Sequence, residues 1–374
     1  MTGACADCLR RGELLSLLAA NIDRSVGARA GERARDLLAL GDRELAAAVA
    51  PTGWRAALAA AADRARGTAA SRGEAGWAMC PHGTGLPPGL DALGRSRPRA
   101  LFGRGDARLV AGLGPERAVT IVGSRRSGAY GREVAHELAR ELAIAGIVVV
   151  SGLALGIDSA AHEGALAAGG ATVAVLGPGA DRAYPRSAGG LYRRICDAGA
   201  VVSELAPGVP TFRWVFPARN RLMAALAGVT VVVEAAERSG SLITAEMAIE
   251  AGRTVGAVPG PVTSPRSSGT NRLLADGAAL VRDCRDVLDL LLGPGSAPPQ
   301  PRGPAVSGHC GAVMAALDDG AATADAIAAA AGIGFSATLV ALARLERDGY
   351  VRGDHRGRWT RTTLRPPAGG RGGS

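Results

Sequence analysis

Arginine and aromatic side chains gather in one short segment of this 374-residue chain. The chain has only four Phe, four Trp and four Tyr, yet three of these rings lie in Phe212-Arg-Trp-Val-Phe216. Arg213 lies among the rings, and Arg219-Asn220-Arg221 follows them. Proteins that hold single-stranded nucleic acid combine rings for base stacking, which contributes about 1–3 kcal/mol per base, with cations that follow the phosphates. The segment therefore predicts a site of this kind.

Alternating rings are also typical of a strand whose side chains face a core. That interpretation suits one or two of Phe212, Trp214 and Phe216, and Trp214 is the ring that we expect to be buried. It leaves the arginines of the segment unexplained, so we favour the binding interpretation.

A glycine-rich turn follows the first predicted strand, in Ile121-Val-Gly-Ser-Arg-Arg-Ser-Gly-Ala-Tyr-Gly131. Such a turn offers backbone N–H groups and the positive end of a helix to phosphate, and Arg125 adds a cation. The glycine spacing is not GxGxxG, and the second strand ends in Ser151-Gly152 rather than in a carboxylate. A dinucleotide site is therefore disfavoured. The alternative is a tight turn that binds nothing.

Other polar side chains follow neighbouring strands. Asp158 and His162 stand four residues apart on one helical face, as an acid–base pair would. Asp158 also suits a helix N-terminus, and we favour that structural role because no nucleophile or metal cluster is adjacent in sequence. Glu234 and Ser239-Gly240-Ser241 come after the fifth strand, where we expect Ser241 to cap the next helix.

Four candidate metal ligands occur near the N-terminus, in Cys5-Ala-Asp-Cys8 and Cys80-Pro-His82. A CxxC pair is a common half-site for zinc, and three cysteines with one histidine would complete a tetrahedron. The sequence predicts one structural zinc ion per chain and no other cofactor. The alternative is three unrelated thiols and a loop histidine, since a second CxxC is missing.

All of the basic residues counted in this chain are arginines. There are 43 basic and 34 acidic residues, which gives a net charge of +9, and the sequence contains no lysine. A Walker A loop and a pyridoxal Schiff base are excluded, because each needs a lysine. The excess of arginine suits phosphate and favours a nucleic-acid partner.

No apolar run approaches the roughly 20 residues that span a bilayer, and the start of the chain does not read as a signal peptide. We therefore expect a cytoplasmic protein with no membrane partner. Its six cysteines are expected to be thiols or metal ligands rather than disulfides.

The elements that must position these residues follow from the apolar pattern. Short apolar runs alternate with helical segments, which predicts an α/β domain with a Rossmann-like, doubly wound, mostly parallel sheet over residues 96–293. The predicted strands are residues 119–122, 147–150, 172–176, 201–203, 229–233, 254–258 and 279–281. We expect a helical N-terminal domain at 1–95, a Pro/Gly linker at 294–305, a winged helix at 306–364 and a disordered tail at 365–374.

Taken together, these segments resemble the DNA-processing protein A (DprA, or Smf) family over residues 118–290. The resemblance is carried by Val122-Gly-Ser-Arg125, Ser151-Gly-Leu-Ala-Leu-Gly-Ile-Asp-Ser-Ala-Ala-His162, Val175-Leu-Gly-Pro-Gly179, Tyr184-Pro185, Ser203-Glu204, Phe216-Pro-Ala-Arg-Asn-Arg221, Val233-Glu-Ala235, Ser239-Gly-Ser-Leu-Ile-Thr-Ala245, Val258-Pro-Gly260 and Gly269-Thr-Asn-Arg272.

The resemblance implies a homodimeric protein that is not an enzyme, binds single-stranded DNA and loads the RecA recombinase onto it during natural transformation and related recombination. It implies that Phe216 contacts a base. The residues expected to bind the strand are Gly123, Ser124, Arg125, Ser151, Gly152, Arg213, Phe216, Arg219, Asn220, Arg221, Ser239, Gly240 and Ser241. Many family members have arginine where this chain has Leu155 and Ala218, and either difference would weaken binding.

Two other classes of function stay open. Rossmann-like nucleotide phosphoribohydrolases also place Arg and Glu beside glycine-rich loops, and Glu204 or Glu234 could act on a ribosyl bond. Their Pro-Gly-Gly-x-Gly-Thr loop is absent here. A transcription factor built around the winged helix would explain only the C-terminal block.

Overall fold

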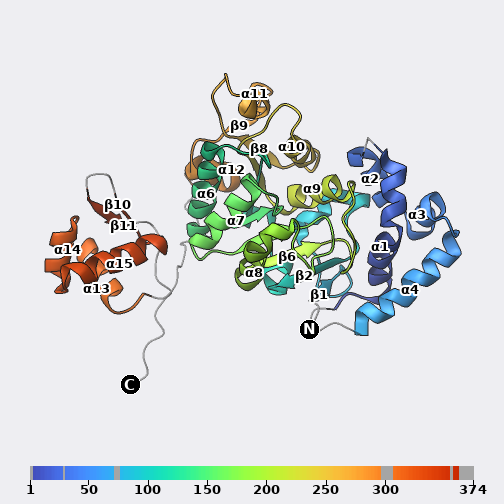
Figure 1. The fold of residues 1–374 in the computed structure, drawn as a ribbon, viewed down its shortest axis with the longest axis horizontal. Coiled ribbons are helices and arrows are strands. Elements are labelled where there is room, and N and C mark those ends of the chain that lie inside the picture. The colour runs from blue at the N-terminus through green and yellow to red at the C-terminus, as the bar shows by residue number, and fades with distance from the viewer. Residues whose placement is uncertain (1–2, 28–29, 71–75, 296–305, 354–356, 362–374) are drawn as a thin grey trace.

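A sheet of nine strands forms the centre of the protein in the computed structural model, which describes residues 3–27, 30–70, 76–295, 306–353 and 357–361 (Figure 1). The strands lie in the order β1-β2-β6-β5-β4-β3-β7-β8-β9. Their bounds are β1 Trp77–Met79, β2 Leu101–Gly105, β3 Ala118–Val122, β4 Val148–Ser151, β5 Thr172–Val175, β6 Ala200–Ser203, β7 Val229–Val232, β8 Thr254–Ala257 and β9 Ala279–Leu280.

The prediction of an α/β protein with a mostly parallel sheet is confirmed. Strands β3 to β9 pair only in parallel with one another, whereas β2 pairs antiparallel with both β6 and β1. All seven predicted strands occur, with ends that differ by one residue. Strands β1 and β2 were not predicted, because β1 has only three residues and β2 ends in Gly103-Arg104-Gly105 instead of an apolar run.

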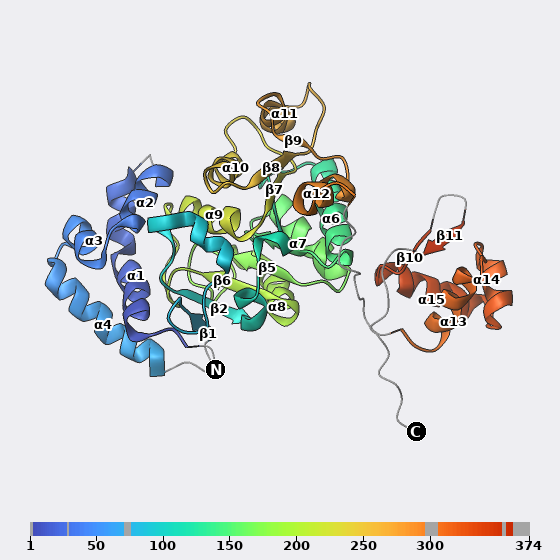
Figure 2. The ribbon, with the colours of Figure 1, turned by 180° about the vertical axis from the view of Figure 1, so that it is seen from behind.

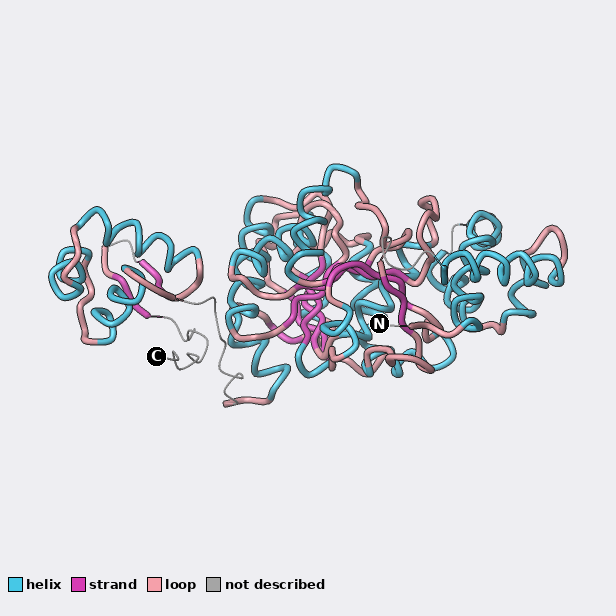
Figure 3. The backbone as a smooth tube through the Cα atoms, turned by 90° about the horizontal axis from the view of Figure 1, so that it is seen from below, coloured by secondary structure: helices cyan, strands magenta, loops and turns pink. Residues whose placement is uncertain are grey.

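Helices cover both faces of the sheet because the parallel strands are apolar on both sides. Val119 and Ile121 face the cluster that includes α6 and α7, while Val122 faces the cluster that includes α9 and α10. Figure 3 shows the strands gathered centrally with helices around them. The helices are α5 Ala107–Ala111, α6 Ala129–Ile144, α7 Ile157–Ala167, α8 Gly189–Ala198, α9 Val215–Leu226, α10 Gly240–Glu250, α11 Ser268–Ala275 and α12 Cys284–Leu292, with the 3-10 turns η3 Pro115–Arg117, η4 Arg186–Ala188 and η5 Pro265–Ser267.

The strand order places a switch point at the middle of the sheet. From β3 the chain builds β4, β5 and β6 toward one edge, and then returns to add β7, β8 and β9 on the other side of β3. In doubly wound sheets, ligands bind outside the carboxyl ends of the strands at the point where the order reverses. A binding site is therefore expected beside the loops that follow β3 and β7.

In the N-terminal part, the described residues form four helices, α1 Ala6–Val26, α2 Ala30–Ala39, α3 Asp42–Val49 and α4 Trp54–Ala70. The block expected to be helical, residues 1–95, also contains strand β1 of the sheet and the 3-10 segment η2 Pro88–Ser96. Side chains of α1 share an apolar cluster with Trp214 and Val215, at the start of α9. This contact joins the N-terminal helices to the carboxyl-edge segment that carries the aromatic rings.

Where the structure describes the C-terminal part, at residues 306–353 and 357–361, it has three helices and a two-stranded antiparallel ribbon (Figure 2). The elements are α13 His309–Asp318, α14 Ala324–Ala331, α15 Phe335–Arg347, β10 Val351–Gly353 and β11 Trp359–Arg361. Most of the predicted linker and the whole predicted tail lie outside the described residues. Among the described helices, none taken singly is long and apolar enough to cross a membrane, although two sharply bent pairs, Asp42–Val49 with Trp54–Gly67 and Ala324–Ala331 with Phe335–Arg347, meet the length and composition test together.

Candidate nucleic-acid interface

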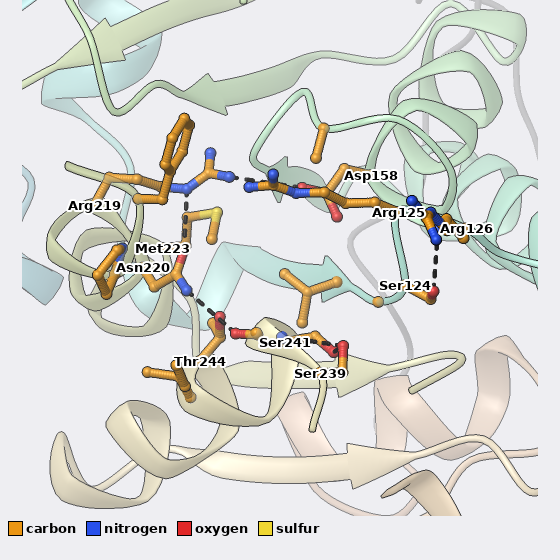
Figure 4. A pocket seen from close by; sticks show the side chains of 17 residues that line it. Ser124, Arg125, Arg126, Asp158, Arg219, Asn220, Met223, Ser239, Ser241 and Thr244 are labelled. Carbon is orange, nitrogen blue, oxygen red and sulfur yellow. Dashed lines mark hydrogen bonds and ion pairs between the residues drawn. The ribbon is translucent and has the colours of Figure 1, made fainter. Parts of the chain in front are cut away.

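A cavity of about 500 Å³ opens at the carboxyl edge of the sheet, at the switch point (Figure 4). Loops after β3, β4 and β7 line it together with one side of α9. Its lining consists of Val122, Gly123, Ser124, Arg125, Arg126, Ala154, Asp158, Phe216, Pro217, Arg219, Asn220, Met223, Ser239, Gly240, Ser241, Ile243 and Thr244. Three of these side chains are arginines and only one is acidic, so the cavity favours an anionic ligand.

Arg125 and Phe216 line this cavity and form a stack with Tyr184, which contacts Phe216 but is not among the lining residues. The guanidinium carbon of Arg125 is 5.0 Å from the centroid of the Phe216 ring. The ring of Tyr184 is 5.2 Å from that of Phe216, centroid to centroid, with an angle of 40° between the planes. The arginine is exposed and both rings are half-buried. The stack therefore places a cation and an aromatic surface side by side, which is the combination that single-strand binding uses.

Arg219 lines the cavity, but its guanidinium already has partners within the protein. Its guanidinium donates to the carbonyl oxygens of Gly152, at 2.7 Å, and of Val175. Its Nε donates to Oδ1 of Asn220 at 3.0 Å, and a carboxylate oxygen of Asp158 lies 3.9 Å away. Burial lowers the pKa of Arg219 to about 10, so it still carries its charge at neutral pH. These bonds fasten α9 to the ends of β4 and β5.

Asp158 is buried at the first turn of α7, where the favoured structural role places it. One of its oxygens accepts a hydrogen bond from the N–H of Gly152 at 3.2 Å. Burial raises its pKa, and the positive charge of Arg219 opposes that rise. Asp158 therefore balances the buried guanidinium and leaves Arg125 and Arg126 as the cavity's exposed charges.

His162 has a separate set of partners. Thr172 Oγ1 donates to the carbonyl oxygen of Val149 at 2.6 Å, so the contact of 2.7 Å between this hydroxyl and His162 Nδ1 is donated by the ring. The ring is fully buried, and burial lowers its pKa to about 3, with a smaller contribution from Arg219. His162 is thus a neutral core side chain at physiological pH.

The buried ring makes stability depend on pH. The pKa of His162 in the folded chain lies below its value of about 6.5 in the unfolded chain. Acidification below pH 6.5 therefore protonates the unfolded chain first and lowers the free energy of unfolding. This histidine contributes up to about 1.4 kcal/mol per pH unit to that loss. An NMR titration should show the His162 ring neutral down to about pH 4. A ring that titrates near pH 6.5 in the folded protein contradicts the assignment.

Polar side chains at the start of α10 close another side of the cavity. Ser239, not Ser241, caps this helix, since its hydroxyl accepts from the N–H of Ser241. The expectation that Ser241 is the cap is therefore wrong by two residues. The two hydroxyl oxygens are 2.8 Å apart, and Asn220 Nδ2 donates to the carbonyl oxygen of Gly240 at 3.4 Å. Asn220 thereby links α9 to the α10 turn across the cavity.

Two arginines predicted for the site lie elsewhere. Arg221 is only 1% exposed, and its guanidinium donates to both carboxylate oxygens of Glu204 at 2.9 and 2.7 Å. Since a helix turns about 100° per residue, Arg219 and Arg221 lie on nearly opposite sides of α9. Arg213 is exposed in the loop before α9, outside the cavity lining, and its backbone N–H donates to Asp23.

Ser151 and Gly152 also have structural roles. The hydroxyl of Ser151 donates to the carbonyl oxygen of Ile121 at 2.6 Å, which ties the ends of β4 and β3 together. Gly152 offers its carbonyl oxygen to Arg219, and a Cβ at this position would collide with that guanidinium. Neither residue lines the cavity.

The N-terminus of α6, which the sequence analysis assigned to phosphate, is occupied by a carboxylate. The N–H of Gly128, the cap residue of α6, donates to both oxygens of Glu234 at 2.9 and 3.2 Å. Glu234 is buried and does not line the cavity. A phosphate at this edge would therefore meet the side chains of Ser124, Arg125 and Arg126.

Several residues with no predicted binding role lie at the site: Arg126, Met223, Ile243 and Thr244 line the cavity, and Tyr184 contacts Phe216. Two of them could have been predicted from helical spacing. Met223 comes one turn after Arg219, and Thr244 comes one turn after Gly240, so each shares a helix face with a predicted site residue. Tyr184 comes from the segment after β5, and only the rarity of aromatic residues in this chain could have singled it out.

Comparison with known proteins places most of the chain among DNA-processing proteins. The family model described as DNA recombination-mediator protein A matches residues 78–292. The chain is 47% identical over 194 residues to a putative DNA processing protein DprA from Mycobacterium tuberculosis, a match that covers 52% of this chain and 49% of the relative. It is 40% identical over 206 residues to Protein Smf from Escherichia coli, covering 55% and 54% of the two chains. The chain thus spans about half the length of the curated relatives that it matches.

Two solved structures share the fold. DNA processing protein A from Streptococcus pneumoniae superposes with a TM-score of 0.57 at 31% identity, covering 75% of this chain and 93% of the other. A structure of the Helicobacter pylori protein, described for its single-stranded DNA binding mode, gives a TM-score of 0.51 at 33% identity, covering 55% and 93%. The family match includes every residue that lines the cavity. From this match and these relatives we conclude that the chain belongs to the DNA recombination-mediator protein A family, which includes the proteins named DprA and Smf.

Proposed function

We propose that this chain binds single-stranded DNA at the carboxyl edge of its sheet, in a DNA-processing role like that of its DprA and Smf relatives. The observation that carries the proposal is the stack of Arg125, Phe216 and Tyr184 at an arginine-lined cavity. Bases would stack on the rings while Arg125 and Arg126 contact phosphates. The binding mode described for the Helicobacter pylori relative supports this proposal.

Binding should prefer single strands and fall steeply with salt. Each arginine–phosphate contact releases condensed counterions, and for single strands the slope of log K against log salt is about −0.7 per contact. Gel shifts with matched single- and double-stranded oligonucleotides over a salt series measure both properties. Equal affinity for the two forms, or a slope near zero, would contradict the proposal.

Phe216 tests the stacking part of the proposal. Removing its ring should weaken single-strand binding by about 1–3 kcal/mol, which is roughly 5- to 150-fold, with little change in the salt slope. Phe216→Ala is compared with Phe216→Tyr, which keeps an aromatic face and should bind nearly as tightly as the unaltered chain. Equal affinity of all three proteins would remove Phe216 from the site.

The finer parts of the proposal are that the chain protects incoming single strands and loads the RecA recombinase in natural transformation or recombination, as a cytoplasmic homodimer. The description of its family as a recombination mediator supports this role. Loading is measured as faster RecA assembly on strands coated with single-strand-binding protein. Size-exclusion chromatography with light scattering measures the mass, for which we expect twice the 37.6 kDa of one chain.

We favour a binding protein over the alternative phosphoribohydrolase. Both candidate catalytic carboxylates are engaged elsewhere, Glu204 with Arg221 and Glu234 with the N–H of Gly128, and neither lines the cavity. Incubation with nucleoside monophosphates should therefore release no free base. Release of a base at a rate that scales with protein concentration would favour the enzyme.

The three helices and ribbon at the C-terminus fit the winged helix that we expect there. We propose that this part is not the principal binding site, because the cavity and the stack lie wholly within residues 78–292. A chain shortened to residues 1–295 should still bind single strands. Loss of all binding on this truncation would instead favour the transcription-factor alternative.

A further inference from the structure

We propose that Cys5, Cys8, Cys80 and His82 bind one zinc ion, and that this ion fastens helix α1 to the end of strand β1. Each residue offers one ligand atom, and these four atoms all lie within 4.8 Å of one another. The inference goes beyond DNA binding and does not depend on it.

The two sulfur–nitrogen distances that involve His82 suit a tetrahedral ion. With Zn–S bonds of about 2.3 Å and Zn–N bonds of about 2.05 Å, tetrahedral angles place a sulfur and a nitrogen ligand about 3.6 Å apart. His82 Nδ1 lies 3.5 Å from Cys5 Sγ and 3.4 Å from Cys8 Sγ. The cysteines are free thiols rather than disulfides, as expected from the sequence. Three thiols and one imidazole nitrogen make a complete ligand set for structural zinc.

The local backbone brings the ligands together in pairs. Cys5 is the cap residue of α1 and Cys8 lies in its first turn, so their side chains share one face of the helix. Cys80 directly follows β1, and its carbonyl oxygen accepts from the N–H groups of Gly83 at 3.2 Å and Gly85 at 3.1 Å. This tight turn carries His82 back over the two cysteines of α1.

The surroundings of the cluster also suit a bound metal. Cys8 and Cys80 are buried, Cys5 is half-buried, and the exposed His82 closes the site on the solvent side. The backbone N–H of Cys5 donates to Cys80 Sγ at 3.3 Å. Such a hydrogen bond orients a thiolate ligand and offsets its charge. With four protein ligands the ion keeps no open position, so its role is structural rather than catalytic.

Helix α1 connects the proposed zinc site to the candidate interface through hydrogen bonds. The hydroxyl of Ser16 accepts from the N–H of Ala206 at 3.0 Å, and the carbonyl oxygen of Ala19 accepts from Trp214 Nε1 at 2.9 Å. One turn further, Asp23 accepts from the backbone N–H of Trp214 at 3.3 Å. The ion thus fixes the N-terminal end of the helix whose following turns hold the start of α9.

Metal content is the direct test. The full chain, purified without chelator, should contain about one zinc ion per molecule by mass spectrometry of the metal. Cys80→Ser should contain less than about a tenth of that, whereas Cys196→Ser, which alters a thiol in α8 outside the cluster, should keep a full equivalent. Should Cys80→Ser fail to fold, Cys5→Ser and His82→Asn replace less buried ligands and should show the same loss.

Cobalt replacement tests the geometry. The chain reconstituted with Co²⁺ should show the visible absorption of tetrahedral cobalt and the thiolate-to-metal charge-transfer bands, both absent from the Cys80→Ser variant. Two results overturn the proposal: an unaltered chain with neither zinc nor cobalt bands after reconstitution, or a Cys80→Ser variant that retains a full equivalent of zinc.

Hydrogen exchange tests the positioning role. Removing zinc with a chelator should speed exchange at the amides of α1 and at Trp214 by about tenfold or more, leave β4 and β5 unchanged, and be reversed by added zinc. The melting temperature should fall by roughly 5 °C or more. Zinc that binds stoichiometrically but leaves exchange in α1 and at Trp214 unchanged would overturn the positioning role.

Discussion

Replacing Arg125 and Arg126 together by alanine is expected to weaken single-stranded DNA binding by about 100-fold or more at low salt. Both side chains are exposed at the cavity, and the ion pairs among the described residues include neither. Hydrogen bonds from a charged donor contribute about 1.5–3 kcal/mol each, so two lost phosphate contacts account for this factor. The slope of log K against log salt should also become shallower by about 1.4.

A matched variant tests whether the loss of affinity comes from this site or only from the loss of two positive charges. Arg108→Ala with Arg117→Ala removes the same charge from exposed positions outside the cavity, and Arg117 directly precedes β3, at the amino edge of the sheet. Its affinity should fall by only a fewfold. Fluorescence anisotropy with a labelled oligonucleotide gives both the affinities and the slopes. Equal losses in the two double variants would mean that the strand does not bind at the cavity.

Arg221→Ala should act on stability rather than on binding. Arg221 is buried and makes two hydrogen bonds to Glu204, and it also donates to the carbonyl oxygens of Ser96 and Ala218. Removing it leaves the Glu204 carboxylate, which is only 12% exposed, without its counter-charge. Breaking such a buried pair costs about 3–5 kcal/mol of unfolding free energy, measurable by urea denaturation.

Replacing both partners by apolar side chains controls for this loss. The double variant Arg221→Met with Glu204→Leu leaves no unpaired charge, so it should lose less stability than Arg221→Ala alone. Below the onset of unfolding, both variants should bind single strands nearly as well as the unaltered chain. If Arg221→Ala keeps its stability but loses affinity for single strands, Arg221 serves the DNA site and the structural assignment is wrong.

The sequence was sufficient to predict the seven parallel strands of the sheet and the edge at which the site lies. Residues 119–122 and 229–232 are each apolar at three of four positions, with one threonine, which is typical of a short strand buried on both faces, and polar turns follow them. Because all carboxyl ends of parallel strands meet at one edge, the turns after β3 and β7 had to lie at that edge, and the pairing of β3 with β7 makes them neighbours. Strands β1 and β2 lacked this signal, since β1 has only three residues and only the first two residues of β2 are apolar.

The roles of individual polar residues could not be predicted from the sequence pattern. Arg219 and Arg221 stand two positions apart, and only the phase of α9 against the sheet decides which one meets the cavity. Glu234 was visible as a polar residue after β7, but its occupation of the α6 N-terminus depends on a contact across 106 residues of sequence. Tyr184 reaches Phe216 through a similar long-range contact.

The segment from Phe212 to Arg221 separates what the sequence determined from what the tertiary structure decided. Its residue types and its place after the predicted strand at residues 201–203 indicated that rings and cations would lie near the binding edge, because both are read directly from the sequence. Tertiary packing decided that Trp214 is buried against α1, that Phe216 contacts both Arg125 and Tyr184, and that Arg221 pairs with Glu204. The partner of a polar or aromatic side chain is set by which distant segments the fold brings within a few ångströms, and local spacing carries no record of that.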